Sequence, residues 1–145
     1  MRTLFLRKPA NKGRFTSKTD AMNRSKRIWV CVHCQAWHKE KVKTCSQCIS
    51  TEILYFASTI EARRYAELSL QQHHGIISNL TVKPRYPIVV QGIAIRVYEA
   101  DFEYTRNGAE VVEDVKPAMF RTDVYKLKRD LVHALYPIKI TEVTP

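Results

Sequence analysis

The sequence predicts a mixed α/β fold, in which one central sheet is flanked by helices and preceded by a small metal-binding knuckle. Three observations support this prediction: four cysteines within one short window, two segments with helical spacing, and several β-rich segments. The chain has 145 residues, 45% of them hydrophobic, which is enough for one modest core. No apolar stretch approaches membrane-spanning length, and residues 1–12 lack the pattern of a secretion signal. We therefore expect a cytoplasmic protein with no membrane partner.

Residues 1–27 are strongly basic, and we expect them to form a flexible arm. They contain nine Lys and Arg residues and one acidic residue, so they carry +8 of the chain's formal net charge of +10. A basic segment with few apolar residues is typical of an arm that contacts nucleic-acid phosphates. A solvated segment that only raises solubility is the alternative. The candidate phosphate contacts in this arm are Arg7, Lys8, Lys12 and Arg14.

Residues 28–52 are expected to form a zinc knuckle, because all four cysteines of the chain lie there in two CxxC units. Cys31 and Cys34 form the first unit, and Cys45 and Cys48 form the second, with ten residues between the units. Zinc prefers four thiolates in a closed tetrahedron, and each CxxC turn supplies two neighbouring ligands. Two disulfides are the competing interpretation, but they are rare in the cytoplasm.

Two histidines and two tryptophans belong to the same region. His33 and His38 could each replace a cysteine ligand, but four sulfurs already complete the site, so we expect both to be bystanders. Trp29 and Trp37 are expected to pack on the knuckle, because so small a unit has little else for a core. Stacking of these indoles on nucleic-acid bases is the alternative.

Residues 53–145 are expected to form the α/β core, which begins with a helix at Thr59–His73. Ser58-Thr59-Ile60-Glu61 matches the S-x-x-E capping box, in which the serine and glutamate side chains satisfy free backbone amides. Gly75 is expected to stop the helix. Glu61 also begins a stripe at helical spacing, so that it lies on a partly buried face; the stripe continues with Tyr65, Leu68 and Gln72.

After the first helix, the core is predicted to contain β-rich runs, a second helix and a last strand. The order of the whole core is then αβββαβ. The first runs are Leu80–Tyr86 and Ile88–Ile95, punctuated by Pro84, Pro87 and Gly92. The second helix should begin near Thr122 or Asp123 and end at Tyr136-Pro137. Its apolar positions match helical spacing: Val124, Leu127, Leu131, Ala134 and Leu135. The last strand is Ile138–Val143.

A β-hairpin is predicted from Val97–Thr105 and Glu110–Lys116, because Asn107-Gly108 between them is a strong signal for a two-residue type I′ turn. This turn pairs Arg106 with Ala109, and the same register places Asp101 opposite Asp114 and Glu99 opposite Lys116. Alternation of side chains puts one set on the core face: Ala100, Phe102, Tyr104, Val111 and Val115.

On the other hairpin face, the register brings Asp101, Asp114 and Lys116 together. Like charges that face each other across two strands are destabilising unless a cation lies between them. Two carboxylates suit Mg²⁺ or Mn²⁺, with the remaining positions left to water and substrate phosphate. A lysine beside such a cation could orient water or neutralise charge on a phosphorane. A solvated face with salt bridges, such as Glu99 to Lys116, is the alternative.

Asp101, twelve intervening residues, and Asp114-Val115-Lys116 together resemble the PD-(D/E)xK nuclease signature. The blocks YFASTIEARRYAEL, YEADFEY, VVEDVKP and TDVYKLKRDLVHALYPI are similar to those of small phage-encoded endonucleases related to Holliday-junction resolvases and RecB-type nucleases. The resemblance covers about residues 55–143. Ala100 stands where the signature has proline, and Pro117 where glycine is expected after the lysine.

The resemblance implies a restriction-endonuclease-like core in which Glu61, Asp101 and Asp114 bind Mg²⁺ and Lys116 is the catalytic lysine. Capping alone also explains Glu61. Glu113 is expected on the opposite face of the hairpin, so it is not a ligand. Cations on the second helix either touch the DNA backbone or belong to an ordinary solvated face: Lys126, Lys128 and Arg129.

The function expected from these features is that of a metal-dependent DNA endonuclease from a phage or prophage, acting in a bacterial host on branched or recombination-intermediate DNA. Its partner is DNA, and a homodimer is plausible because cleavage of a four-way junction needs two incisions. The alternative is a zinc-ribbon protein that binds nucleic acid without catalysis. Carboxylates facing phosphate favour the first function, since a protein that only binds gains nothing from them.

Overall fold

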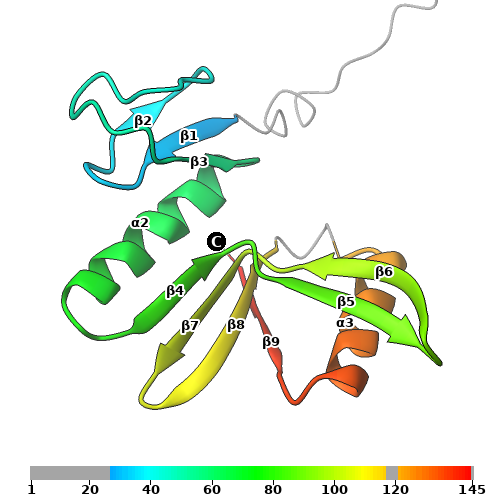
Figure 1. Ribbon diagram of the computed structural model, residues 1–145. Helices are drawn as coiled ribbons and strands as arrows, with labels where there is room; N and C mark the ends of the chain where they lie inside the picture. The colour runs from blue at the N-terminus through cyan, green and yellow to red at the C-terminus, as the bar shows by residue number, and fades with distance from the viewer. Residues whose placement is uncertain (1–26, 117–120, 145) are drawn as a thin grey trace, which may run out of the picture.

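A computed structural model of the chain describes residues 27–116 and 121–144 (Figure 1). These residues form a mixed α/β structure with three sheets and two helices, as the sequence predicts in outline. The basic arm falls outside the described residues, except for Arg27, and so does Pro117. Among the described residues, no helix combines the length and the apolar character needed to cross a membrane.

The N-terminal sheet is three-stranded and antiparallel, in the order β2-β1-β3. Its strands are β1 (Ile28–Cys31), β2 (Trp37–His38) and β3 (Ile53–Phe56). Cys31 ends β1, and the other three cysteines of the two CxxC units lie in the turns that join these strands. The central strand β1 pairs along its whole length with β3, which leads directly into the first described helix.

This helix, α2 (Thr59–His73), has the predicted bounds and the predicted capping box. The Ser58 hydroxyl accepts a hydrogen bond from the Glu61 amide at 3.2 Å, and the Glu61 carboxylate accepts one from the Ala57 amide at 3.2 Å. After the helix, Gly75 adopts φ +70°, a conformation that disfavours side chains and turns the chain toward the next strand.

The central sheet has four strands in the order β4-β7-β8-β9. They are β4 (Ser78–Val82), β7 (Phe102–Arg106), β8 (Ala109–Val115) and β9 (Ile140–Val143). The strands pair antiparallel except β8 and β9, which run parallel because α3 (Asp123–Leu135) connects them. The bounds of α3 agree with the predicted second helix.

A separate two-stranded sheet contains β5 (Arg85–Val90) and β6 (Ile93–Glu99). Gln91 and Gly92 both have positive φ, 50° and 80°, so they form the turn of this second hairpin. The predicted runs Leu80–Tyr86 and Ile88–Ile95 have the wrong boundaries, because the first spans the break between β4 and β5 and the second spans the turn between β5 and β6. Pro87 lies inside β5, where an edge position tolerates a residue without an amide hydrogen.

The predicted strand Val97–Thr105 was also wrong, because the chain changes sheets in its middle. The residues Ala100 and Asp101 separate β6 from β7. The Ala100 amide donates to the Pro84 carbonyl at 3.1 Å, and the Lys83 amide donates to the Asp101 carbonyl at 2.9 Å. Alternation fails at this junction, so Ala100 packs with the cluster around α3 rather than with Phe102.

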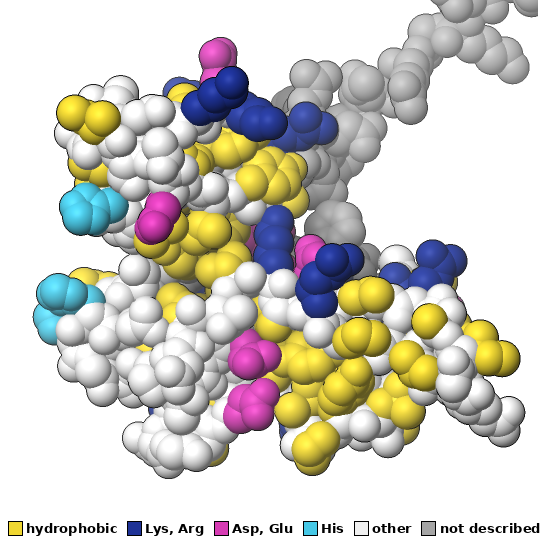
Figure 2. Space-filling model, in the orientation of Figure 1, with side chains coloured by type: hydrophobic (Ala, Val, Ile, Leu, Met, Phe, Trp, Pro, Cys, Tyr) yellow, Lys and Arg dark blue, Asp and Glu magenta, His cyan; other side chains and the backbone are white. Residues whose placement is uncertain are grey.

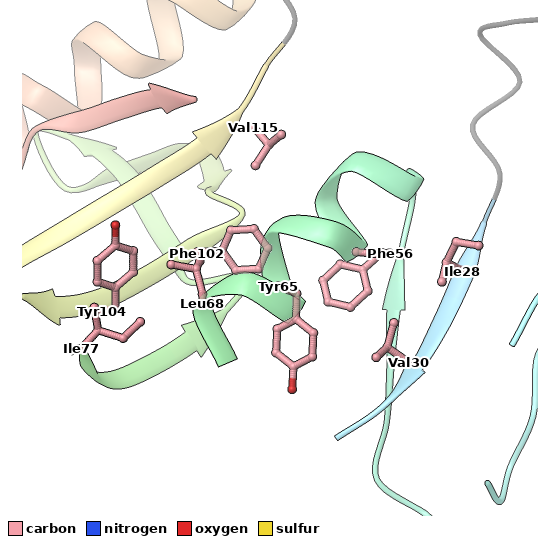
Figure 3. Packing of buried hydrophobic residues seen from close by; sticks show 10 residues of the cluster. Ile28, Val30, Phe56, Tyr65, Leu68, Ile77, Phe102, Tyr104 and Val115 are labelled. Carbon is pink, nitrogen blue, oxygen red and sulfur yellow. The ribbon is translucent and has the colours of Figure 1, made fainter. Parts of the chain in front are cut away.

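Two hydrophobic clusters lie on either side of the central sheet. In Figure 3, Tyr65 and Leu68 of α2 lie between the strand residues Val30 and Phe56 and the central-sheet residues Phe102 and Val115. The helix therefore joins the N-terminal sheet to the central sheet. The second cluster contains side chains from β5, β6, β8, β9 and α3.

The apolar positions of α3 that match helical spacing do not all lie in the core: Leu131 packs against the second cluster, but others are exposed. Val124 is 63% exposed and Leu127 is 62% exposed, whereas Tyr125 and Val132 are buried. Helical spacing alone cannot distinguish two adjacent apolar faces of one helix. The aromatic face of α3 is buried because Tyr125 lies beside Tyr98 of β6, with ring centroids 6.4 Å apart.

Candidate functional site

The four cysteines converge into one cluster, as the zinc prediction requires. Their sulfur atoms all lie within 4.8 Å of one another, with 3.4 Å between Cys31 and Cys48 and 3.5 Å between Cys34 and Cys45. These separations exceed a disulfide bond of about 2.05 Å. A zinc ion about 2.3 Å from four sulfurs holds them roughly 3.8 Å apart, close to the arrangement observed. The four cysteines are thus free thiols arranged for one metal ion such as zinc.

The turn backbone favours thiolates at Cys31 and Cys45, whereas burial and the neighbouring sulfurs outweigh the backbone contacts of Cys34 and Cys48 and raise the pKa of both. The Cys34 amide faces the Cys31 sulfur and lowers the pKa of that thiol to about 6, although burial acts in the opposite direction. The Gln47 amide donates to the Cys45 sulfur at 3.4 Å. Since the thiolate is the form that binds metal, these contacts suit metal ligation. His33 is exposed and His38 is half-buried, and neither belongs to the cluster.

The hairpin register that the sequence predicts is confirmed. Arg106 pairs with Ala109 and Phe102 with Glu113, and the Asp101 amide donates to the Glu113 carbonyl at 3.1 Å. Asp101 therefore lies across from Asp114 where β7 begins and β8 ends. The Glu99 side chain, by contrast, lies 3.6 Å from Arg85 on β5, so the predicted pair of Glu99 with Lys116 was wrong. The change of sheet at Ala100 explains this difference.

The two aspartates interact directly and are poorly hydrated. Asp114 is only 3% exposed, and Asp101 is half-buried. Burial and the adjacent Asp114 carboxylate raise the pKa of Asp101 to about 8, with a further contribution from Glu61. One oxygen of Asp101 accepts a hydrogen bond from the Val115 amide at 2.7 Å, which opposes this rise only in part. In the absence of a cation, the pair therefore retains a proton to a higher pH than an isolated aspartate does.

Two further side chains hold this pair in place. The Tyr98 hydroxyl donates a hydrogen bond to Asp114 Oδ2 at 2.5 Å, and burial raises the pKa of Tyr98. Lys116 Nζ lies 3.9 Å from Asp114 Oδ1 and 4.7 Å from the centre of the Tyr125 ring. The ammonium therefore lies beside the aspartates, at the partly exposed edge of the site.

Glu61 lies near this pair but is engaged in the cap of α2. Its carboxylate accepts hydrogen bonds from the Ser58 hydroxyl at 3.0 Å and from the Ala57 amide. It is close enough to contribute to the raised pKa of Asp101. Within residues 27–116 and 121–144, however, only the four cysteines form a group of three or more side chains placed to hold a metal ion, so the three carboxylates do not form such a group in this structure.

Glu113 points to the face opposite to Asp114, as the register predicts. It is buried against α2, where Arg64 donates to its two oxygens at 2.9 and 2.8 Å. Tyr104 donates a third hydrogen bond to the same carboxylate. Glu113 is therefore a neutralised structural residue.

Glu142 on β9 is a neighbour of the site that the sequence did not reveal. It pairs directly with Asp114 in the parallel register of β8 and β9. Burial acts to raise its pKa, but Arg129, Arg121 and the Tyr125 hydroxyl outweigh burial and lower the pKa. The alternation of Ile140–Val143 is the signal that puts Glu142 on one face. The register across α3, which brings it beside Asp114, has no local sequence signal.

The predicted cations of α3 are mostly paired within the chain. Lys126 lies 3.2 Å from Asp123, and Arg129 lies 2.7 Å from Glu142 and 2.9 Å from Asp130. Lys128 is half-buried. The candidate cations of the basic arm lie outside the described residues: Arg7, Lys8, Lys12 and Arg14.

Comparisons with known proteins identify a family but no activity. Neither a search of curated proteins nor a search of solved structures gave a match. The model of one family, described as "Protein of unknown function (DUF1064)", matches residues 41–144. This range includes the second CxxC unit, both helices, Asp101, Asp114 and Lys116. Because the match covers well over half of the chain, the protein belongs to the DUF1064 family.

Proposed function

We propose that this protein is a Mg²⁺- or Mn²⁺-dependent endonuclease that hydrolyses phosphodiester bonds of DNA. The observation that carries the proposal is the pair of opposed carboxylates, Asp101 and Asp114, with the ammonium of Lys116 3.9 Å from Asp114. Two adjacent buried carboxyl groups cost folding free energy when both are ionised, so their presence needs a reason. Binding of a divalent cation supplies one.

The donor set fits a hard divalent cation. Two carboxylates supply oxygen ligands, and the partial exposure of Asp101 and Lys116 leaves room for water and a substrate phosphate. A cation would also replace the proton that the raised pKa of Asp101 favours. Glu61 is the third candidate ligand, because its electrostatic effect reaches Asp101. Its capping bonds use only part of the accepting capacity of its carboxylate.

The side chains around the two aspartates have separate roles in the proposed hydrolysis. A bound cation would polarise the phosphate and lower the pKa of a water molecule. Asp101 and Asp114 would hold that cation, and the Tyr98 hydroxyl orients Asp114 through its hydrogen bond at 2.5 Å. Lys116 neutralises negative charge that develops on the phosphorane or orients the attacking water. Tyr125 keeps the ammonium near the aspartates through a cation–π contact.

The substrate class rests on resemblance and charge. The pattern Asp101, Asp114-Val115-Lys116 resembles the PD-(D/E)xK signature, and the flanking blocks resemble small phage endonucleases related to Holliday-junction resolvases. The restriction-endonuclease-like form of the core, the phage or prophage origin, and a homodimer that makes paired incisions are parts of this proposal. The basic arm and the zinc knuckle would hold DNA against the acidic site.

Cleavage of DNA with defined branches tests this proposal. Purified zinc-loaded protein should cut flapped or four-way-junction DNA in the presence of Mg²⁺, and Asp114→Ala should not cut it. Linear duplex of the same composition shows whether a branch is needed. If no DNA or RNA is cut with Mg²⁺ or Mn²⁺ while binding persists, the non-catalytic zinc-ribbon function replaces this proposal.

A further inference from the structure

The N-terminal sheet carries a row of aromatic side chains that the zinc cluster does not use. Trp29 on the central strand pairs with His38 on one side and with Tyr55 on the other. Directly paired residues project from the same face, so these three rings form a row across all three strands. The rings of Trp29 and Tyr55 lie 5.4 Å apart at 49°, and Tyr55 is 39% exposed.

The opposite face of this sheet already supplies the hydrophobic packing. Ile28, Val30 and Phe56 alternate with the aromatic row and are buried against α2. The knuckle therefore does not need Tyr55 for its core, and a large ring at this position remains partly open to solvent. Trp29 and His38 are half-buried, and Tyr55 is the exposed ring of the row. Aromatic rings that remain partly open on a sheet are the surface on which unpaired bases stack in many single-strand-binding proteins.

Lys83 connects the aromatic row to the acidic site. Its ammonium lies 4.8 Å above the centre of the Tyr55 ring. Its amide donates to the carbonyl of Asp101 at 2.9 Å. Lys83 also has φ +56°, a left-handed conformation that is unfavourable for a residue with a side chain. The backbone thus holds a lysine in an unfavourable conformation between a solvent-accessible ring and a proposed metal ligand.

The surroundings of the row are basic on balance, because Glu40 and Glu52, which are also exposed, are fewer than the exposed cations. Lys39, Lys41 and Lys43 follow His38 in the loop that leads to the second CxxC unit, and all three are exposed. Arg27 precedes β1 and is exposed. Figure 2 shows Lys and Arg side chains over the N-terminal sheet and in the notch below it, with hydrophobic surface between them. This charge suits a polyanion, whereas a hydrophobic protein partner would gain little from it.

We propose that Trp29, Tyr55 and Lys83 form a binding track for unpaired nucleotides, which directs a single-stranded segment of DNA toward Asp101 and Asp114. Bases stack on Tyr55 and Trp29, and the ammonium of Lys83 contacts the phosphate that follows. The direction toward the acidic site rests on the proposed nuclease function, but the binding of unpaired bases does not. A stacking row needs exposed base faces, which an uninterrupted duplex does not offer. The track therefore selects DNA with a flap, a fork or a branch.

Intrinsic fluorescence tests the track directly. The chain has two tryptophans, so Trp37→Phe leaves Trp29 as the reporter. Zinc-loaded Trp37→Phe protein is titrated with a short oligothymidylate and with a blunt duplex of equal charge, without added Mg²⁺ or Mn²⁺. We expect the oligothymidylate to quench Trp29 and the duplex to leave it nearly unchanged. Absence of quenching by the oligothymidylate overturns the proposal.

Substitutions at the other two positions separate stacking from charge. Tyr55→Leu should weaken oligothymidylate binding about tenfold, as expected for one lost stack, while Tyr55→Phe should bind normally. Lys83→Asn keeps a residue that tolerates positive φ and should lower the slope of log affinity against log salt by about 0.7. Zinc content and melting temperature verify that each variant is folded. Equal binding by Tyr55→Leu and Tyr55→Phe overturns the track.

The failure of this inference is distinguishable from the failure of the nuclease proposal. If Tyr55→Leu loses oligothymidylate binding but the wild-type protein cuts no DNA, the track stands and the nuclease proposal falls. If the wild-type protein cuts branched DNA and Tyr55→Leu cuts it equally well with unchanged binding, the nuclease proposal stands and the track falls.

Discussion

Glu113 and Asp114 are adjacent in β8, but their carboxylates lie on opposite faces of the central sheet and have opposite surroundings. Glu113 is held by the guanidinium of Arg64, with two hydrogen bonds of 2.9 and 2.8 Å. Asp114 faces Asp101, and its nearest ammonium is that of Lys116 at 3.9 Å. One carboxylate is therefore neutralised by a guanidinium, while the other shares its site with a second carboxyl group.

The first prediction concerns the stability that Glu113 provides. Glu113→Gln should reduce the free energy of unfolding by about 3–5 kcal/mol, because it leaves the guanidinium of Arg64 without its buried partner. Denaturant unfolding measures this loss. The triple variant Arg64→Met, Tyr104→Phe and Glu113→Leu is the control, because it also removes the hydroxyl that donates to Glu113, and it should recover much of the stability. Wild-type stability of Glu113→Gln would contradict the structural role of the pair.

The second prediction concerns the pH dependence of stability without Mg²⁺ or Mn²⁺. The pKa of Asp101 rises from its ordinary value of 3.8 to about 8 on folding, so between these pH values the folded state holds a proton that the unfolded state has lost. Stability should therefore fall as the pH increases from about 4 to 8. In Asp101→Asn this component should be absent. Thermal melts at several pH values compare the two proteins.

Metal binding should reverse this loss of stability. At pH 8, Mg²⁺ or Mn²⁺ should raise the melting temperature of the wild-type protein more than that of Asp101→Asn or Asp114→Asn, because only the wild type offers both carboxylates. Equal shifts in all three proteins would show that the cation binds elsewhere.

The third prediction concerns the cysteine cluster. The purified protein should contain about one zinc per chain, and Cys31→Ser or Cys48→Ser should lose it and loosen the N-terminal sheet. Elemental analysis and proteolysis measure the two effects. Ser46→Ala, between the second pair of cysteines, is a matched control that should keep the metal. Four oxidised sulfurs without zinc would contradict the metal site.

The fourth prediction concerns the basic arm. Neutralisation of its four candidate cations with glutamine should weaken DNA binding and lower the salt dependence of the affinity, since fewer counterions are released. The substituted positions are Arg7, Lys8, Lys12 and Arg14. The melting temperature should not change. An unchanged salt dependence would leave the arm with a role in solubility only.

Local signals predicted the helices and the hairpin register correctly. Ser58 and Thr122 cap the two described helices, and Asn107-Gly108 sets the pairing of β7 and β8. Each of these features depends on a few residues close in sequence, so propensity and turn chemistry suffice to place them. The same register placed Asp101 opposite Asp114 and Glu113 on the other face.

Features that depend on distant contacts were not predictable in the same way. Gln91 adopts φ 50° in the turn between β5 and β6, although glutamine is not a residue type that favours positive φ. The sequence therefore did not predict this hairpin. Val124 and Leu127 match helical spacing, yet Tyr125 packs against Tyr98 instead, because tertiary contacts choose between adjacent faces. The proximity of Glu142 to Asp114 likewise depends on a parallel register that the crossover through α3 determines.

The central claim is that Asp101, Asp114 and Lys116 together hydrolyse DNA, and the rate of Mg²⁺-dependent cleavage by matched variants tests it most directly. Asp101→Asn, Asp114→Asn and Lys116→Ala should each reduce cleavage to background, whereas Glu113→Gln, measured on folded protein, should stay within about tenfold of the wild type. DNA binding by both Asn variants should be intact or tighter, since less negative charge opposes the phosphates. Loss of cleavage in Glu113→Gln together with normal cleavage by Asp114→Asn would contradict the assignment of the site.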